Sequence, residues 1–157
     1  MLKVLALLGL AALTSAAPQA DKVDSLPDMG TFPYGVYSGY LPINGTSKSL
    51  HYFFFESQSN PSTDPLLVWY SGGPGCSSML AFAIEHGAFV VKNGDYNFTK
   101  NEYSWNREAN IIYIESPAGV GYSVCDKSKG DCTFDDDSTA DDNLIAILNW
   151  FNKFPEF

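Results

Sequence analysis

The sequence predicts an α/β fold, and three stretches support that prediction. Residues 66–85 combine a short apolar run, a glycine-proline loop and the beginning of a helix. Residues 111–114 form a second apolar run rich in β-branched side chains, and another glycine-containing loop follows it. Residues 138–154 have the apolar spacing of an amphipathic helix. Because ligands of such sheets bind at the carboxyl ends of the strands, we expect both glycine loops to face one crevice.

Length and composition limit the class of protein. A chain of 157 residues, of which 45% are hydrophobic and 15% aromatic, is typical of one globular domain with an apolar core. The formal net charge of −9 offers no basic patch for phosphates, so we expect no nucleic-acid partner. We also expect neither a cofactor nor a metal site.

The first 17 residues are predicted to be a secretory signal peptide. Lys3 precedes an apolar segment at 4–13, and small residues at 14–16 offer a cleavage site. The apolar segment is too short to span a membrane, so we expect no membrane attachment after cleavage. A buried N-terminal helix is the alternative. Residues 18–157 are then one domain in the secretory pathway, destined for the extracellular space, a vacuole or a lysosome.

Two strands are predicted ahead of the glycine loop. Residues 35–43 and 51–56 form a β-hairpin around a turn that contains Asn44-Gly45. His51 lies among aromatic residues in the second strand, and we interpret it as a surface or edge histidine rather than a catalytic one. The run 66–70 is bounded by turn residues on both sides, which predicts a central strand covered on both faces.

The loop after that strand contains Gly72, Gly73 and Gly75, which permit positive φ angles, and Pro74, which stiffens the turn. Such a loop can direct backbone N–H groups at an anion. In an acyl-transfer enzyme this anion would be the developing oxyanion. Taken alone, however, a glycine loop is more often a tight connection between a strand and a helix.

The remaining elements follow from the apolar spacing. A helix at 78–85 is expected to be capped by Ser77 or Ser78, and two short strands are expected on either side of a turn at 93–94. The acidic run at 135–137 is interpreted as solvated, and Asp141 and Asp142 favour the N-terminus of the helix at 138–154. The side chains expected to face inward are Leu80, Phe82, Ala83 and Ile84 in the first helix and Ala140, Leu144, Ile147, Leu148 and Phe151 in the second.

Residues 69–78, WYSGGPGCSS, resemble the W-x-N-G-G-P-G-C-S-S signature of the serine carboxypeptidases, a branch of the α/β-hydrolase fold. Eight of the nine specified positions match, and the exception is Ser71, where the family usually carries Asn. Residues 104–123 resemble a second family segment, which ends in E-S-P-A-G-V-G-F-S. Residues 85–89 resemble the family's E-x-G-P-F, with Ala88 in place of proline.

The resemblance implies an incomplete α/β-hydrolase fold that consists of the N-terminal strands and helices. In the family, the nucleophile elbow G-E-S-Y-A-G follows the helix that ends in Phe-Pro-Glu, and this chain ends at Phe157. The serine, the acid and the histidine of the triad are therefore expected beyond its end. No G-x-S-x-G elbow is present, because the near matches at 75–79 and 121–125 lack the second glycine. A private Ser77–His86 dyad is an alternative that we disfavour.

The resemblance also implies half of a substrate site. Gly73 matches the glycine whose backbone N–H binds the oxyanion. Ser71, Gly72, Gly73 and Glu85 match residues on the substrate side, and Glu85 corresponds to the carboxyl group that helps bind the substrate's C-terminal carboxylate. A carboxyl group donates a hydrogen bond only when protonated, so this recognition favours acidic pH. Because the Ser71 hydroxyl is shorter than an asparagine amide, we expect it to reach the carboxylate through a water.

The cysteines and sequons fit a secreted protein. Cys125 and Cys132 lie close together in a polar loop and could form a small disulfide, which leaves Cys76 as either a buried thiol or a residue whose partner lies outside the chain. In the family, the cysteine of the signature pairs with a distant downstream cysteine. Asn44 and Asn97 are predicted glycosylation sites.

The functional prediction is a serine carboxypeptidase that releases C-terminal residues from peptides and proteins through an acyl-enzyme. Without the triad, the chain as printed is expected to be inactive. One alternative is a carboxypeptidase-like acyltransferase, which passes the acyl group to an alcohol. Another is a non-catalytic, truncated binding module, and the unpaired hydrophobic sheet edge that such a module would expose argues against it.

Overall fold

The computed structural model describes residues 17–92 and 96–157. The predicted signal peptide, except for Ala17, and the predicted turn at 93–94 lie outside these residues. The strands are β1 Ser25–Leu26, β2 Gly30–Thr31, β3 Val36–Pro42, β4 Ser49–Phe55, β5 Leu66–Trp69, β6 Phe89–Val91, β7 Phe98–Lys100 and β8 Asn110–Ile114. The helices are η1 Gln19–Asp21, α1 Ser78–Ala81, η2 Phe82–His86, η3 Trp105–Arg107, η4 Lys127–Lys129 and α2 Asp136–Lys153.

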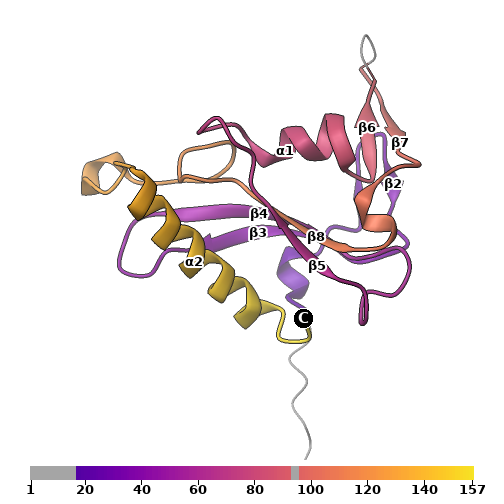
Figure 1. The fold of residues 1–157 in the computed structure, drawn as a ribbon, viewed down its shortest axis with the longest axis horizontal. Helices are drawn as coiled ribbons and strands as arrows, with labels where there is room; N and C mark the ends of the chain where they lie inside the picture. The colour runs from indigo at the N-terminus through magenta and orange to yellow at the C-terminus, as the bar shows by residue number, and fades with distance from the viewer. Residues whose placement is uncertain (1–16, 93–95) are drawn as a thin grey trace, which may run out of the picture.

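A four-stranded mixed sheet in the order β3-β4-β8-β5 lies at the centre of the fold (Figure 1). β3 and β4 form the predicted antiparallel hairpin, β4 is antiparallel to β8, and β8 is parallel to β5. All five residues of β8 are buried, because this strand has neighbours on both sides. Since β5 and β8 are parallel, the loops that follow them leave the same edge of the sheet, as the sequence predicted.

In residues 17–92 and 96–157 β5 lies at the edge of the sheet, and its prediction as a central strand covered on both faces stays a prediction. Among the described residues its strand neighbour is β8, and Leu67 is 38% exposed. A short apolar run between turn residues shows that a strand is present, but it does not show how many neighbours that strand has. Among the described strands, β8 has a neighbour on both sides.

Helices cover both faces of the sheet (Figure 1). Side chains alternate along β4, so Tyr52 and Phe54 face α2 and pack with Trp150 in one cluster. Phe53 and Phe55 point the other way and pack against α1 and η2 in a second cluster. The aromatic content of the sequence is therefore divided between two apolar layers, one on each side of the sheet.

The helix predicted at 138–154 is present as α2, but its inward face was predicted wrongly. Asp135 caps the helix through a capping box with Ser138. The buried side chains of α2 are Asp142, Ala146 and Trp150, whereas Leu144 and Leu148 are 57% and 55% exposed. The predicted inward face did not include Asp142, whose carboxylate lies 2.7 Å from a buried partner, Lys48. This ion pair turns the face that carries Asp142 toward the sheet.

The first helix begins as predicted and then departs from the predicted pattern. Ser77 is its N-cap, since its hydroxyl accepts a hydrogen bond from the backbone of Met79. Phe82 is buried, whereas Leu80 and Ile84 are 50% and 58% exposed and do not face inward. The helix changes from α1 into the wider π-helical turn η2, which shifts its inward face.

Candidate active site

The glycine loop, residues 72–76, connects β5 to α1. Gly73 and Gly75 have φ angles of 129° and 95°, which side-chain-bearing residues rarely adopt. A Cβ atom at Gly73 would lie 3.2 Å from the Cys76 sulfur and backbone nitrogen. All five loop residues are exposed, and no hydrogen bond among the described residues uses the Gly73 N–H. This N–H is therefore free to bind a ligand.

Two serines after the loop anchor it to the end of β8. The Ser78 hydroxyl accepts a hydrogen bond from the Ser71 backbone at 3.1 Å and donates one to the Ile114 carbonyl at 2.6 Å. The Ser77 hydroxyl donates to the Glu115 carboxylate while it caps α1. Hydrogen bonds therefore hold Ser71 and Ser77, the residues directly before and after the exposed loop.

Ser71 and Glu85 are each next to one member of the aromatic pair formed by Trp69 and His86. The Ser71 hydroxyl accepts a hydrogen bond from the Trp69 indole at 3.2 Å, and the Trp69 ring contacts the His86 ring at a centroid distance of 4.5 Å. Glu85 precedes His86 and is exposed, and it makes no hydrogen bond to Ser71 among the described residues. Burial, followed by the charge of Glu85, raises the pKa of Tyr113, which places the Glu85 carboxylate near that ring.

The structure does not form the alternative Ser77–His86 dyad. His86 is 6% exposed, stacks on Trp105 at a centroid distance of 4.0 Å, and has its Nδ1 3.1 Å from the Tyr113 hydroxyl. Burial lowers the pKa of His86, and the charge of Glu85 only partly opposes this shift. A neutral, buried ring is therefore the form that the fold favours.

Glu115 is, after Glu85, a second carboxylate in the candidate site, and the sequence pattern assigned it no role. Its side chain is fully buried, and it accepts hydrogen bonds from the Ser77 hydroxyl and, at 2.7 Å, from the Tyr122 backbone. His51 Nδ1 lies 3.1 Å from the same carboxylate. Burial raises the pKa of Glu115, but these hydrogen bonds outweigh burial and hold the pKa below its usual value. The carboxylate is therefore a fixed negative charge beneath the glycine loop.

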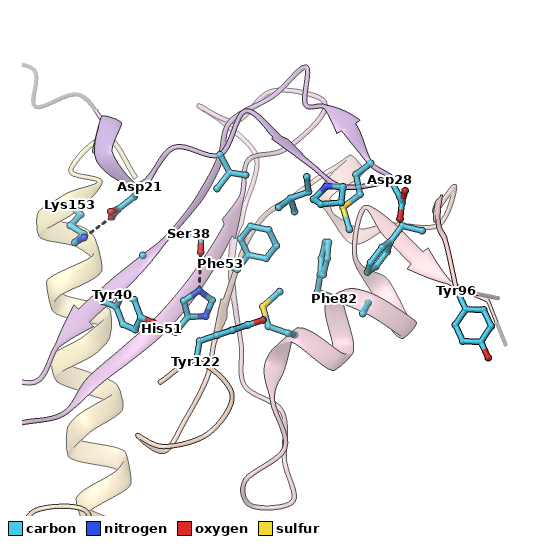
Figure 2. A pocket seen from close by; sticks show the side chains of 18 residues that line it. Asp21, Asp28, Ser38, Tyr40, His51, Phe53, Phe82, Tyr96, Tyr122 and Lys153 are labelled. Atoms are coloured by element: carbon cyan, nitrogen blue, oxygen red, sulfur yellow. Dashed lines mark hydrogen bonds and ion pairs between the residues drawn. The ribbon is translucent and has the colours of Figure 1, made fainter. Parts of the chain in front are cut away.

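His51 contacts Glu115 through one ring nitrogen and Ser38 through the other, so the prediction of a surface or edge histidine was wrong. It is 7% exposed, and its Nε2 lies 2.9 Å from the Ser38 hydroxyl (Figure 2). The strand that carries it is paired on both sides, which a local pattern does not reveal. No local sequence signal indicates the contact between His51 and Glu115, because the two residues are 64 positions apart.

Ser38 and His51 lie at one end of a cleft of about 900 Å³, whose wall includes Phe53 and Phe82 (Figure 2). The contacts from Ser38 through His51 to Glu115 have the atomic order of a hydrolase triad. Ser38 nevertheless lies within β3, whereas the nucleophile of an α/β-hydrolase needs a sharp strand-to-helix turn. We therefore assign these contacts to the support of the site and not to nucleophilic attack.

The predicted cysteine pair and sequons are visible in the described residues. Cys125 and Cys132 form a disulfide. Cys76 is unpaired and exposed in the glycine loop, so the buried-thiol alternative was wrong. Asn44 and Asn97 are both exposed.

The described part of the chain contains neither a cluster of metal ligands nor a membrane-spanning helix. No three His, Cys, Asp or Glu side chains in residues 17–92 and 96–157 gather as metal ligands would. Within the same residues, no helix has the length and apolar character needed to cross a membrane.

Comparison with known proteins identifies the family. The family model described as serine carboxypeptidase matches residues 27–157. This chain belongs to the serine carboxypeptidase family. Lysosomal protective protein of Mus musculus is 41% identical over 157 residues, which cover 99% of this chain and 32% of the relative. Serine carboxypeptidase-like 21 of Arabidopsis thaliana is 44% identical over 150 residues, which cover 92% of this chain and 30% of that protein.

A solved serine carboxypeptidase shares the fold. A prohormone-processing carboxypeptidase from Saccharomyces cerevisiae superposes with a TM-score of 0.64 and 29% sequence identity over 78% of this chain and 29% of its own. The similarity confirms the predicted α/β-hydrolase fold in its incomplete form. The chain spans 30–32% of the length of the two relatives named above.

Proposed function

We propose that this chain forms the leading part of the catalytic domain of a serine carboxypeptidase, which releases C-terminal residues from peptides and proteins through an acyl-enzyme. The observation that supports this most directly is the free Gly73 N–H, in an exposed glycine loop at the carboxyl end of β5. A backbone N–H fixed in this way stabilises the oxyanion of each tetrahedral intermediate. The serine, the acid and the histidine of the reaction come from residues after Phe157.

Substrate recognition is proposed to involve Ser71, Gly72 and Glu85. A protonated Glu85 donates a hydrogen bond to the substrate's C-terminal carboxylate, so binding strengthens as pH falls. The Ser71 hydroxyl, already held by Trp69, contacts the carboxylate through a water. The proposal also covers processing and location. Residues 1–17 are removed as a signal peptide, Asn44 and Asn97 are glycosylated, and Cys76 pairs with a later cysteine. The protein is delivered to the extracellular space, a vacuole or a lysosome.

The experiment that tests this function uses the full-length protein with Ser71→Asn. Restoring the amide is expected to raise kcat/KM about tenfold for peptides with a free C-terminus, because a hydrogen bond to a charged group contributes about 1.5–3 kcal/mol. Peptides with an amidated C-terminus should show no gain, and Ser128→Asn, in the exposed helix η4, serves as the matched control. Equal kcat/KM values for the wild-type enzyme and the Ser71→Asn variant on free-carboxylate peptides would contradict the role of position 71 in carboxylate binding.

Two further measurements test the reaction itself. The full-length protein should release C-terminal residues and be inactivated by a serine-directed fluorophosphonate, whereas the 157-residue chain should do neither. Labelling of the short chain that Ser77→Ala abolishes would overturn the assignment of the nucleophile to later residues. A full-length protein that releases no C-terminal residue would overturn the proposed function.

Ser71 also favours a second candidate, a carboxypeptidase-like acyltransferase. Without the asparagine amide, direct recognition of a free carboxylate is weaker, so an ester donor would be accepted more readily. The two activities separate in one assay, in which an acyl donor is offered in water with and without an added alcohol. Hydrolysis as the dominant outcome at all alcohol concentrations would exclude the acyltransferase.

A further inference from the structure

Glu115 joins three segments that are far apart in the sequence. Its Oε1 binds the hydroxyl of Ser77, which follows the glycine loop. Its Oε2 accepts the Tyr122 N–H at 2.7 Å and lies 3.1 Å from Nδ1 of His51 in β4. One buried carboxylate therefore holds the loop after β5, the loop after β8 and the central hairpin together.

The Glu115 carboxylate is enclosed by the loop that follows β8 and by His51. The residue is fully buried, and the absence of a side chain at Gly121 provides the space that the carboxylate occupies. His51 Nδ1 lies 3.1 Å from the Glu115 carboxylate, and His51 Nε2 lies 2.9 Å from the Ser38 hydroxyl, so both ring nitrogens have a polar neighbour. Figure 2 shows His51 between Ser38 and Tyr122, which fixes the ring from both sides.

The glycine loop depends on few other contacts. Residues 72–76 are exposed, and the hydrogen bond within the loop joins the Cys76 N–H to the Gly72 carbonyl at 3.1 Å. The loop's first residue follows Ser71, which Ser78 holds, and its last residue precedes Ser77, which Glu115 holds. Without Glu115, Ser77 loses the hydrogen bond to the end of β8 and keeps only its contacts within α1, so the end of the loop that follows Gly73 is held less firmly.

We infer that Glu115 is a positioning residue that keeps the glycine loop in the shape needed to bind an oxyanion. The inference rests on the proposed carboxypeptidase function. Glu115 does not touch the substrate, and it acts through Ser77. Since a displacement of about 1 Å at a reacting group can cost about a hundredfold in rate, loss of this anchor should reduce the rate of the chemical step. Ground-state binding at Ser71 and Glu85 should change little.

The test measures kcat and KM of the full-length enzyme on a free-carboxylate peptide, at a temperature where every variant is folded. Glu115→Ala is expected to lower kcat about a hundredfold with KM within about threefold of wild type. Glu115→Gln retains the shape and one acceptor oxygen, so it should recover kcat to within about tenfold of wild type. Asp142→Asn is the matched control, since the Asp142 carboxylate is also buried but pairs with Lys48 instead of with the glycine loop.

A second pair of variants covers the case in which Glu115→Ala does not fold. Ser77→Ala removes one hydroxyl from the anchor and is expected to lower kcat about tenfold, in line with the loss of a single orienting contact. Ser116→Ala is its control, because the Ser116 hydroxyl, which is more buried than Ser77, binds Asn143 of α2 at 2.7 Å instead of the loop.

The possible outcomes are distinct. An active wild-type enzyme together with unchanged kcat in Ser77→Ala or in a folded Glu115→Ala, or with equal losses in the control variants, overturns the inference and leaves the proposed function standing. A rise in KM at constant kcat also overturns it, because that result assigns Glu115 to ground-state binding. A wild-type enzyme without carboxypeptidase activity overturns the proposed function, and this inference with it.

Discussion

Gly121 and Gly119 provide a sharp test of how tightly the loop after β8 encloses Glu115. Both glycines have positive φ, 54° for Gly121 and 97° for Gly119, so alanine strains the backbone at either position. At Gly119 the new Cβ would meet open space, whereas at Gly121 it would overlap the Glu115 carboxylate. Both substitutions introduce backbone strain, which is larger at Gly119 because its φ lies farther from the left-handed region that alanine can adopt, and only Gly121→Ala adds an overlap with Glu115.

The magnitudes follow from these contacts. The backbone strain of alanine at Gly121, a left-handed position, should cost about 1–2 kcal/mol of unfolding free energy, and Gly119→Ala should cost at least as much backbone strain. Gly121→Ala adds the displacement of a buried carboxylate from Ser77, Tyr122 and His51. Hydrogen bonds to charged groups are worth about 1.5–3 kcal/mol each and are not additive, so we expect a total loss of about 3–5 kcal/mol.

Urea unfolding followed by tryptophan fluorescence measures these losses, provided that the m-value stays constant. In a Glu115→Ala background the overlap is absent, and Gly121→Ala should cost no more than Gly119→Ala. The double-mutant cycle should then give a coupling energy of about 2–3 kcal/mol between Gly121 and Glu115. An additive double mutant would refute the packing argument.

Two other predictions concern the ion pair and the buried histidine. Lys48→Met should cost about 3–5 kcal/mol of unfolding free energy, because it leaves Asp142 as an unpaired charge with its side chain 8% exposed. Lys48→Met combined with Asp142→Leu should recover most of that loss. A cost below about 1 kcal/mol for the single variant in urea unfolding would show that the pair is dispensable. Burial lowers the pKa of His86 in the folded protein, so the unfolded state binds a proton at this histidine first as pH falls. The unfolding free energy should therefore fall as pH drops below 6.5, the ordinary pKa of histidine. His86→Gln should flatten this dependence between about pH 6.5 and 5, and an unchanged slope would assign it to other groups.

Local signals in the sequence were sufficient for the individual elements and for the backbone conformation of the glycine loop. Apolar runs bounded by turn residues indicated β5 and β8, and Asn44-Gly45 indicated the hairpin of β3 and β4, because these signals lie within a few residues of the element they specify. The positive φ angles of Gly73 and Gly75 were also predictable, since the residue type carries the conformational freedom. The motif from Trp69 to Ser78 was sufficient to indicate the family.

Long-range contacts set which strand is central, which face of α2 is buried and which groups support the glycine loop. The apolar pattern of α2 was misleading because Lys48, 94 residues away from Asp142, makes burial of that carboxylate possible. The contact between His51 and Glu115 spans 64 residues and that between Ser77 and Glu115 spans 38, so neither leaves a local periodic signal. Buried polar groups are stable only when their partners are in place, and those partners are brought together by the fold.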